Sequence, residues 1–357
     1  MVSLVLPLVL VLAAREAGAS TRARHAPCPN ASAWRDGIPV VQCSRSPPCV
    51  EETWTTPERC ATLQLDSSWP TWDPWIARSP HWTSARQLLH THLRGKHLML
   101  VGDSVMRQSF NGLLCEVARQ RVTLSEGGGD RVRQWRARYE ARQESQGWLA
   151  PSRIWHVGST DTILALKGWG TPNAYDTAGM LEAGAGGVVV VNYGLHYGTK
   201  VELYKEDMGR LFASLGEFNG ARRGLAIFRE TCAQAFYRSG SYTRGAEKVT
   251  TQCAPTGAHE AAHNTVVSLN EVVRQLGLVH GVPILGFYNL TLPRWNMRHE
   301  KLCQVPAMRT SADPERECGG GACTAGCNTD CTHLCMTPTL WAAHFSELAQ
   351  VVESNGW

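Results

Sequence analysis

The sequence lacks long hydrophobic runs, internal repeats and a strong charge of one sign. Beyond residue 20 no window holds the roughly 18 successive apolar residues that a membrane-spanning helix needs, and no internal repeat or extended low-complexity tract indicates a repeat architecture. The 35 Lys and Arg nearly balance the 31 Asp and Glu, for a formal net charge of +4. The basic cluster at 131–143 is typical of a solvated helix face. We therefore expect no nucleic-acid partner, and no integral membrane span apart from the signal segment.

The composition and the first residues indicate a globular protein of the secretory pathway. The chain has 357 residues, 43% of them hydrophobic, which is enough for a substantial core. Residues 1–19 combine a short apolar run with the small residues Ala17-Gly18-Ala19, which predicts a signal peptide cleaved after Ala19. An uncleaved signal anchor is the weaker alternative, because no Lys or Arg precedes the run to hold it. The 13 cysteines are typical of an oxidising compartment, and the sequons at Asn30 and Asn289 are candidate glycosylation sites.

The composition and the pattern of apolar residues predict an N-terminal region over 20–95 and a catalytic domain over 96–357. The first is rich in Pro, Trp, Cys and Ser and has no long periodic segment. From residue 96, apolar runs alternate with helical patterns, which predicts a three-layer α/β/α sandwich around a central parallel sheet. The expected strands lie in 97–104, 161–168, 187–194, 224–231 and 281–289, and the expected helices in 105–120, 200–217, 258–279 and 338–353. We expect disulfides to staple the N-terminal region and the Cys- and Gly-rich loop before the last helix.

Ser104 follows the run "LMLVGD" at a junction between a predicted strand and a predicted helix. In open parallel sheets, functional groups collect at this edge, where a helix N-terminus also supplies amide donors. Two interpretations stand equal on this stretch alone: Ser104 is a nucleophile, or it caps the helix.

The segment "NTDCTHLC" offers the base and the acid that a nucleophilic serine needs. Asp330 and His333 lie three residues apart between Cys331 and Cys335, a spacing that can bring the carboxylate to the imidazole. We therefore predict the catalytic set Ser104, His333 and Asp330. The other histidines, at 196, 259, 263 and 344, can be ordinary surface or core residues.

Three residues at predicted strand ends are candidate oxyanion donors. Asn192 ends the run "VVVVN", and Gly168 and Gly170 follow the strand "DTILALKG". A side-chain amide or a backbone amide there can stabilise developing negative charge near Ser104. Asn and Gly are also common where strands end simply because they form turns.

Two blocks of the sequence resemble the signatures of the trichome birefringence-like family, within the PC-esterase and SGNH-type serine hydrolases. They are "VGDSVMRQSFNGLLCEV" and "DCTHLCMTP" followed by "LW", with Leu334 in place of the family's Trp. The segments "VVVVNYGLHY" and "IFRETCAQAF" are similar to intermediate motifs of the family. The matching residues are Arg107, Leu113, Leu114, Cys115, His196, Arg229, Asp330, Cys331, His333, Cys335 and Pro338.

The resemblance implies an SGNH/GDSL hydrolase-like fold, a Ser104, Asp330 and His333 triad, and O-acetylation or deacetylation of polysaccharides in the Golgi lumen or after secretion. On the same resemblance, Arg107, Arg229 and His196 are further oxyanion or substrate residues. The expected partners are an acetyl donor and a glycan acceptor, with no cofactor and no metal. Trp-rich stretches such as 67–82 can supply platforms for sugar rings or simply pack in the core.

Three other functions stay open at this point. The same triad can serve a secreted carbohydrate acetylesterase, because hydrolysis differs from transfer only in the second nucleophile. The fold can also carry a catalytically inactive glycan-binding protein. A zinc site is the weakest alternative: Cys323, Cys327, Cys331 and Cys335 recur every four residues around His333, which is not a usual zinc spacing.

Overall fold

The computed structural model describes residues 34–35, 38–39, 85–119, 123–127, 129–137, 153–168, 174–236, 261–292, 302–303, 327–328, 331–334 and 338–357. The chain divides into two compact units, Met1–Arg45 and Ser46–Trp357. In the first unit the description covers a short antiparallel pair, β1 (Trp34–Arg35) and β2 (Ile38–Pro39). The site lies in the second unit.

A seven-stranded sheet forms the centre of the second unit, in the order β4-β5-β6-β3-β7-β8-β9. The strands from β6 to β9 run parallel to β3, which confirms the predicted parallel core. The strands β4 and β5 add an antiparallel edge that the sequence pattern did not predict. Their bounds are β3 His97–Gly102, β4 Leu124–Glu126, β5 Arg153–Val157, β6 Thr162–Gly168, β7 Val188–Asn192, β8 Leu225–Arg229 and β9 Ile284–Leu285.

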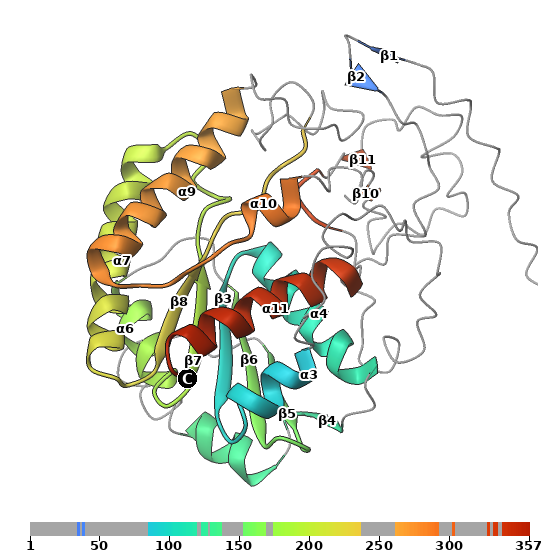
Figure 1. Cartoon of the computed structure of the whole chain (residues 1–357), viewed down its shortest axis with the longest axis vertical. Helices are drawn as coiled ribbons and strands as arrows, with labels where there is room; N and C mark the ends of the chain where they lie inside the picture. The colour runs from blue at the N-terminus through green and yellow to red at the C-terminus, as the bar shows by residue number, and fades with distance from the viewer. Residues whose placement is uncertain are drawn as a thin grey trace, which may run out of the picture. The chain divides into compact units, whose positions relative to one another are not determined.

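Helices cover both faces of the sheet, so the predicted three-layer α/β/α sandwich is confirmed. Successive residues of β3 point to opposite faces: Leu98 and Leu100 enter one hydrophobic cluster, and Met99 and Val101 enter the other. Figure 1 shows α11 crossing in front of the sheet near α4, with α6, α7 and α9 together to the left. The bounds are α3 Ala85–Gln87, η2 Leu88–His92, α4 Ser104–Arg119, α6 Ala174–Ala183, α7 Val201–Gly220, α9 Ala261–His280, α10 Tyr288–Thr291 and α11 Pro338–Ser354.

The predicted N-terminal region, the C-terminal loop and the cysteines are described only in part. Ala85, Leu88, Leu89 and Leu93 are buried in the cluster that also holds α4 and α11, whereas most of 20–84 lies outside the described residues. In the C-terminal loop, β10 (Leu302–Cys303) pairs antiparallel with β11 (Cys327–Asn328). The described cysteines include Cys115 and Cys331, which are disulfide-bonded, and Cys232, which is buried outside any disulfide.

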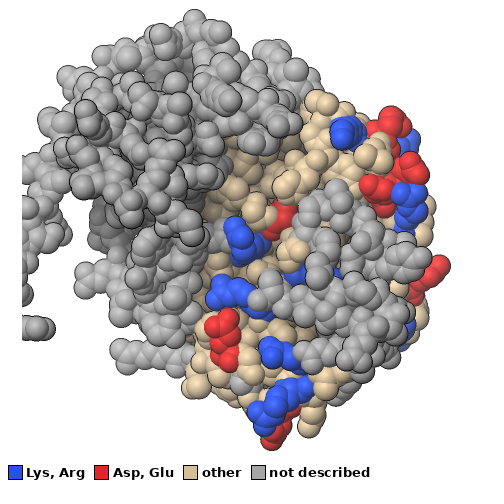
Figure 2. Space-filling model, turned by 180° about the vertical axis from the view of Figure 1, so that it is seen from behind, with Lys and Arg blue, Asp and Glu red and all other residues tan. Residues whose placement is uncertain are grey.

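The described surface carries charges of both signs. Figure 2 shows Lys and Arg atoms interspersed with Asp and Glu atoms on the face that it displays. In the helical stretch 130–137, part of the basic cluster, Arg131 forms an ion pair with Asp161 and Arg133 forms one with Asp130. Among the residues that the structure describes, no helix has both the length and the apolar character needed to cross a membrane. The candidate glycosylation residue Asn289 is exposed on α10, and Asn30 lies outside the described residues.

Helices α4 and α11 approach each other closely at Gly112. A Cβ atom added there would lie 2.7 Å from the ring of Trp341, a side chain that is only 1% exposed. A glycine in the middle of a helix costs about 1 kcal/mol relative to alanine. The contact with the indole explains why this position of α4 has no side chain.

We expect Gly112→Ala to lower the free energy of unfolding by about 1 to 3 kcal/mol, because the added methyl group overpacks the contact with Trp341. Gly209→Ala on α7 is the matched control, since a Cβ atom there meets nothing within 4 Å. The control should raise the free energy of unfolding by about 0.5 to 1 kcal/mol through helix propensity. Urea titrations of the two variants check this, and an equal gain in both would contradict the close contact.

Candidate functional site

The sharp turn between β3 and α4 places Ser104 at the carboxyl edge of the sheet. β3 ends at Gly102, where a Cβ atom would lie 2.4 Å from the carbonyl oxygen of Asn192 in β7. Only glycine fits this close approach of two strands. Asp103 follows, and Ser104 is the first residue of α4.

Asp103, not Ser104, caps the helix. Its Oδ1 accepts hydrogen bonds from the amides of Val105 at 3.0 Å and Met106 at 3.2 Å, and its carbonyl accepts one from the amide of Arg107. This is the arrangement of an N-cap carboxylate, which also complements the helix dipole. The two interpretations of Ser104 are thereby separated, because the capping role belongs to the preceding residue.

The Ser104 hydroxyl meets an imidazole from the far end of the chain. Its Oγ lies 2.6 Å from Nε2 of His333, a residue 229 positions later, and both side chains are half-buried. In this geometry a neutral imidazole accepts the hydroxyl proton through Nε2, as in a nucleophile and base pair. The predicted orienting residue, Asp330, lies outside the described residues.

Hydrogen bonds from two elements hold the segment 331–334 in place. On one side, the amide of Ala235 donates to the carbonyl of Cys331 at 3.0 Å, and Gln234 Nε2 donates to Thr332 Oγ1 at 3.1 Å. On the other side, the amide group of Gln108 in α4 bonds both polar groups of the Leu334 backbone. His333 therefore stands between anchors on both sides.

The arrangement of Cys331 and His333 argues against the zinc alternative. Cys331 is disulfide-bonded, so its sulfur is not a thiolate ligand, and Nε2 of His333 faces Ser104. The side chains of the other cysteines in that alternative lie outside the described residues.

The backbone amide of Ser104 is in the first turn of α4 but is not one of the donors to the cap, Asp103. The next three amides of α4 all bond Asp103, through its carboxylate or its carbonyl. The Ser104 amide thus remains at the positive end of the helix, next to its own hydroxyl. A donor in this position suits a negative charge that develops on a substrate oxygen at Ser104.

Asn192 has a different arrangement from the one predicted. Its side chain is 0% exposed, and its Nδ2 donates to the carbonyl of Arg229 at 2.8 Å, with Thr231 Oγ1 at 3.5 Å. These contacts tie the carboxyl end of β7 to the end of β8. We therefore assign Asn192 to holding the strand ends rather than to direct contact with an oxyanion.

Arg229 is also completely buried, at 0% exposure, so it does not face a solvent-borne substrate. Its NH1 donates to Ser109 Oγ at 2.6 Å, its NH2 lies 4.0 Å from Asp103 Oδ1, and its guanidinium stacks 4.4 Å from the ring of Phe287. Burial lowers the pKa of the guanidinium, and the charge of Asp103 opposes that shift. The predicted substrate residue instead supports the first turn of α4 from within the core.

The remaining predicted residues are dispersed around this edge. Arg107 is exposed on α4, and His196 is exposed in the turn after β7. Gly168 ends β6 directly opposite Gly102 in the register and is exposed, while Gly170 lies outside the described residues.

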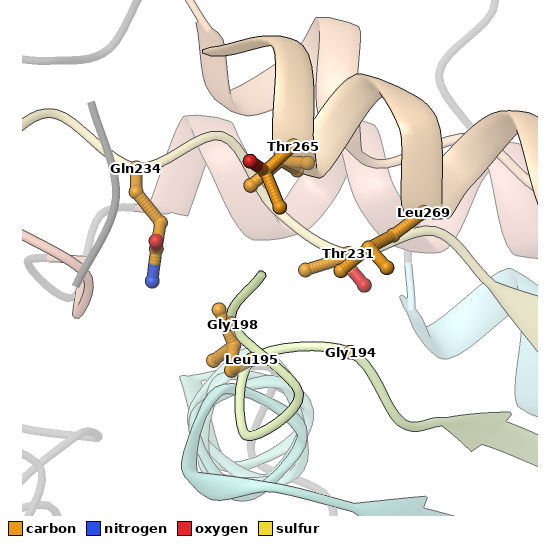
Figure 3. Close-up of a pocket in the computed structure, with 8 residues that line it drawn as sticks. Gly194, Leu195, Gly198, Thr231, Gln234, Thr265 and Leu269 are labelled. Carbon is orange, nitrogen blue, oxygen red and sulfur yellow. The ribbon is translucent and has the colours of Figure 1, made fainter. Parts of the chain in front are cut away.

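A pocket lies beside the segment that carries His333. Figure 3 shows the loop after β7 below it and α9 above it, with Gln234 at one side. Its empty volume is about 250 Å³, part of it open to solvent. Gln234 lines this pocket and also bonds Thr332 of the segment that carries His333. The lining residues are Gly194, Leu195, Gly198, Thr231, Gln234, Thr265, Val266 and Leu269.

Sequence reasoning missed Gln108, Gln234 and Thr332. Gln108 and Gln234 are polar residues at buried positions, 1% and 4% exposed. Gln108 follows Ser104 by four residues and so shares its face of α4, which is a signal that the sequence carries. Its partner is a backbone, which no sequence motif marks.

Comparisons with known proteins show no close relative and several distant structural matches. No protein-family model and no curated protein matches the sequence. The fold is similar to the acetyl xylan esterase AlAXEase, with 11% identity, a TM-score of 0.31, and 55% of this chain and 80% of that chain covered. It is similar to a variant of an acetyl xylan esterase from Geobacillus stearothermophilus, with 11% identity, a TM-score of 0.29, and 56% of this chain and 80% of that chain covered. It is also similar to a lipase/acylhydrolase from Enterococcus faecalis, with 13% identity, a TM-score of 0.28, and 73% of this chain and 95% of that chain covered. These likenesses are distant.

His344 is the buried histidine of α11, 2% exposed and packed between Phe287, Trp341 and Phe345. Burial, with a further contribution from the positive charge of Arg229, holds its pKa well below the usual range of a histidine. The folded protein therefore keeps this imidazole neutral. It belongs to the core and is not a second candidate base.

We expect the stability of the protein to fall as the pH drops below about 6.5, because the unfolded chain then binds a proton that folded His344 does not. This one group contributes at most about 1.4 kcal/mol per pH unit. His344→Phe should therefore reduce the loss of unfolding free energy between about pH 7 and pH 5. Urea titrations at the two pH values check this, with His196→Ala at an exposed position as the control. An unchanged pH dependence in His344→Phe would contradict the assignment.

Proposed function

We propose that the protein is an acyl-transfer enzyme that moves acetyl groups through a Ser-His-Asp triad. Ser104 is the nucleophile, His333 is the general base and acid, and Asp330 is the carboxylate that orients His333. The observation that carries the proposal is the distance of 2.6 Å between Ser104 Oγ and His333 Nε2 at the N-terminus of α4.

The proposed reaction has two steps. In the first, Nε2 of His333 takes the proton of the Ser104 hydroxyl while Oγ attacks the carbonyl carbon of an acetyl ester, and the oxyanion forms near the Ser104 amide. The intermediate then collapses, and the leaving alkoxide takes the proton from His333. In the second step, a glycan hydroxyl or water gives its proton to Nε2 of His333 and attacks the carbonyl carbon of the acetyl-serine. The bond between that carbon and Ser104 Oγ then breaks, and Oγ takes the proton back from His333.

We further propose a polysaccharide or glycan as acceptor and a location in the Golgi lumen or outside the cell. The sequence blocks around Ser104 and His333 resemble those of the trichome birefringence-like family, which supports the glycan substrate. The signal-like residues 1–19 and the disulfide-bonded Cys115 and Cys331 support the compartment. The acetylesterase is the second candidate, because the same pair of residues activates water as well as a sugar hydroxyl.

Labelling with a fluorophosphonate probe tests the nucleophile directly. We expect the wild-type protein to be labelled, Ser104→Ala to lose the label entirely, and His333→Ala to react at least about 1000-fold more slowly, because the members of a triad act as a unit. Asp330→Asn should have a similar or milder effect through the orientation of His333. Ser214→Ala on α7 is the control and should label like the wild type. Equal signals from the wild type and Ser104→Ala would exclude the proposed mechanism.

An acetyl-ester assay with and without added oligosaccharide separates the candidate reactions. Acetylated oligosaccharide as the product identifies a transferase, and free acetate alone identifies an esterase. If the folded protein binds oligosaccharide, is not labelled and yields neither product, the inactive glycan-binding alternative is correct. We expect the acetylated oligosaccharide, and we expect Ser104→Ala to abolish it.

A further inference from the structure

The side chain of Gln108 makes two hydrogen bonds to the backbone of Leu334. Gln108 Nε2 donates to the Leu334 carbonyl at 2.9 Å, and the Leu334 amide donates to Gln108 Oε1 at 3.0 Å. Both residues are only 1% exposed, although they lie 226 positions apart in the chain. A primary amide that uses its donor and its acceptor on one peptide group fixes both the distance and the orientation of that group.

The two ends of this contact lie next to the two reacting residues. Gln108 is four residues after Ser104 in α4, so one turn of one helix carries both. Leu334 directly follows His333. We propose that Gln108 is a positioning residue that holds the imidazole of His333 against the hydroxyl of Ser104. This inference rests on the function proposed above.

The other anchors of the segment do not provide this link. Ala235 and Gln234 bind Cys331 and Thr332, and both belong to the stretch after β8 rather than to α4. They place the segment relative to the sheet. Gln108 places it relative to the helix that carries the nucleophile, so small shifts of α4 move Ser104 and His333 together. A misplacement of about 1 Å between reacting groups can cost about 100-fold in rate.

Loss of two buried hydrogen bonds also lowers stability, so the test needs a control with the same loss elsewhere. Asn219 of α7 makes the same kind of contact with Ala226 of β8. Its Nδ2 donates to the Ala226 carbonyl at 2.9 Å, and the Ala226 amide donates to its Oδ1 at 2.7 Å. Because Ala226 lies near the amino end of its strand, this contact is remote from the carboxyl edge that carries the site. Asn219→Leu therefore removes a pair of hydrogen bonds of the same kind, at a part-buried position, without touching the proposed machinery.

The experiment compares Gln108→Met and Asn219→Leu in the full chain. The readouts are urea unfolding, kcat and KM for an acetyl ester, and the rate of fluorophosphonate labelling. We expect both variants to lose stability, but only Gln108→Met to lower kcat and the labelling rate, by about 10- to 100-fold, with KM nearly unchanged. In a His333→Ala background, Gln108→Met should cause no further loss, because it acts through that imidazole. Gln108→Glu, which keeps an acceptor for the Leu334 amide, is the second variant and should lower kcat in the same direction.

Three results would overturn the inference. Wild-type kcat and labelling in a folded Gln108→Met or Gln108→Glu protein would show that the contact does not position His333. An equal loss in the His333→Ala background would show that Gln108 acts by another route. In both cases Ser104-dependent labelling would leave the proposed function standing. If Ser104→Ala labels like the wild type, the proposed function itself fails, and the inference fails with it.

Discussion

The close approach of Gly102 to the carbonyl of Asn192 is the constraint on which the site depends. β3 lies between β6 and β7, and the missing side chain at its last residue lets its backbone pass within reach of the neighbouring strand end. The chain then turns at once, with Asp103 as the cap and Ser104 as the first helical residue. A bulkier residue at position 102 would displace the start of α4. Ser104 Oγ would then lose its fixed position relative to the sheet edge and to His333.

Beneath this turn, charge and packing keep the cap in place. Asp103 is 4% exposed, and its Oδ1 accepts hydrogen bonds from two helix amides, so this oxygen serves the cap. The buried Arg229 lies 4.0 Å from that oxygen and supplies the opposite charge. Burial of a guanidinium is costly; its hydrogen bond to Ser109 and its contact with the ring of Phe287 offset part of that cost. The same residues therefore hold the first turn of α4 and the core below it.

The sequence was sufficient to predict the parallel strands and the helices that pack on them, because continuous apolar runs are typical of strands buried on both faces. It did not predict β5, where the half-buried Arg153 and His156 interrupt the apolar pattern. It identified Ser104 and His333 by their motifs, and the structure brings them together; Asp330 stays a prediction. The positions of Asn192 and Arg229 at strand ends were visible in the sequence, but the direction of each side chain depends on neighbouring strands that no local pattern specifies.

One face of α4 contacts both the segment that carries His333 and the buried Trp341 of α11. Ser104, Gln108 and Gly112 are spaced four residues apart and share a face of the helix. They contact His333, Leu334 and Trp341 in that order. The last of these belongs to α11, which begins at Pro338, shortly after the segment that carries the imidazole. Helix α4 therefore contacts both the segment that carries the base and the helix whose Trp341 is buried against it. For this reason the proposed catalytic pair can form although its members lie 229 residues apart.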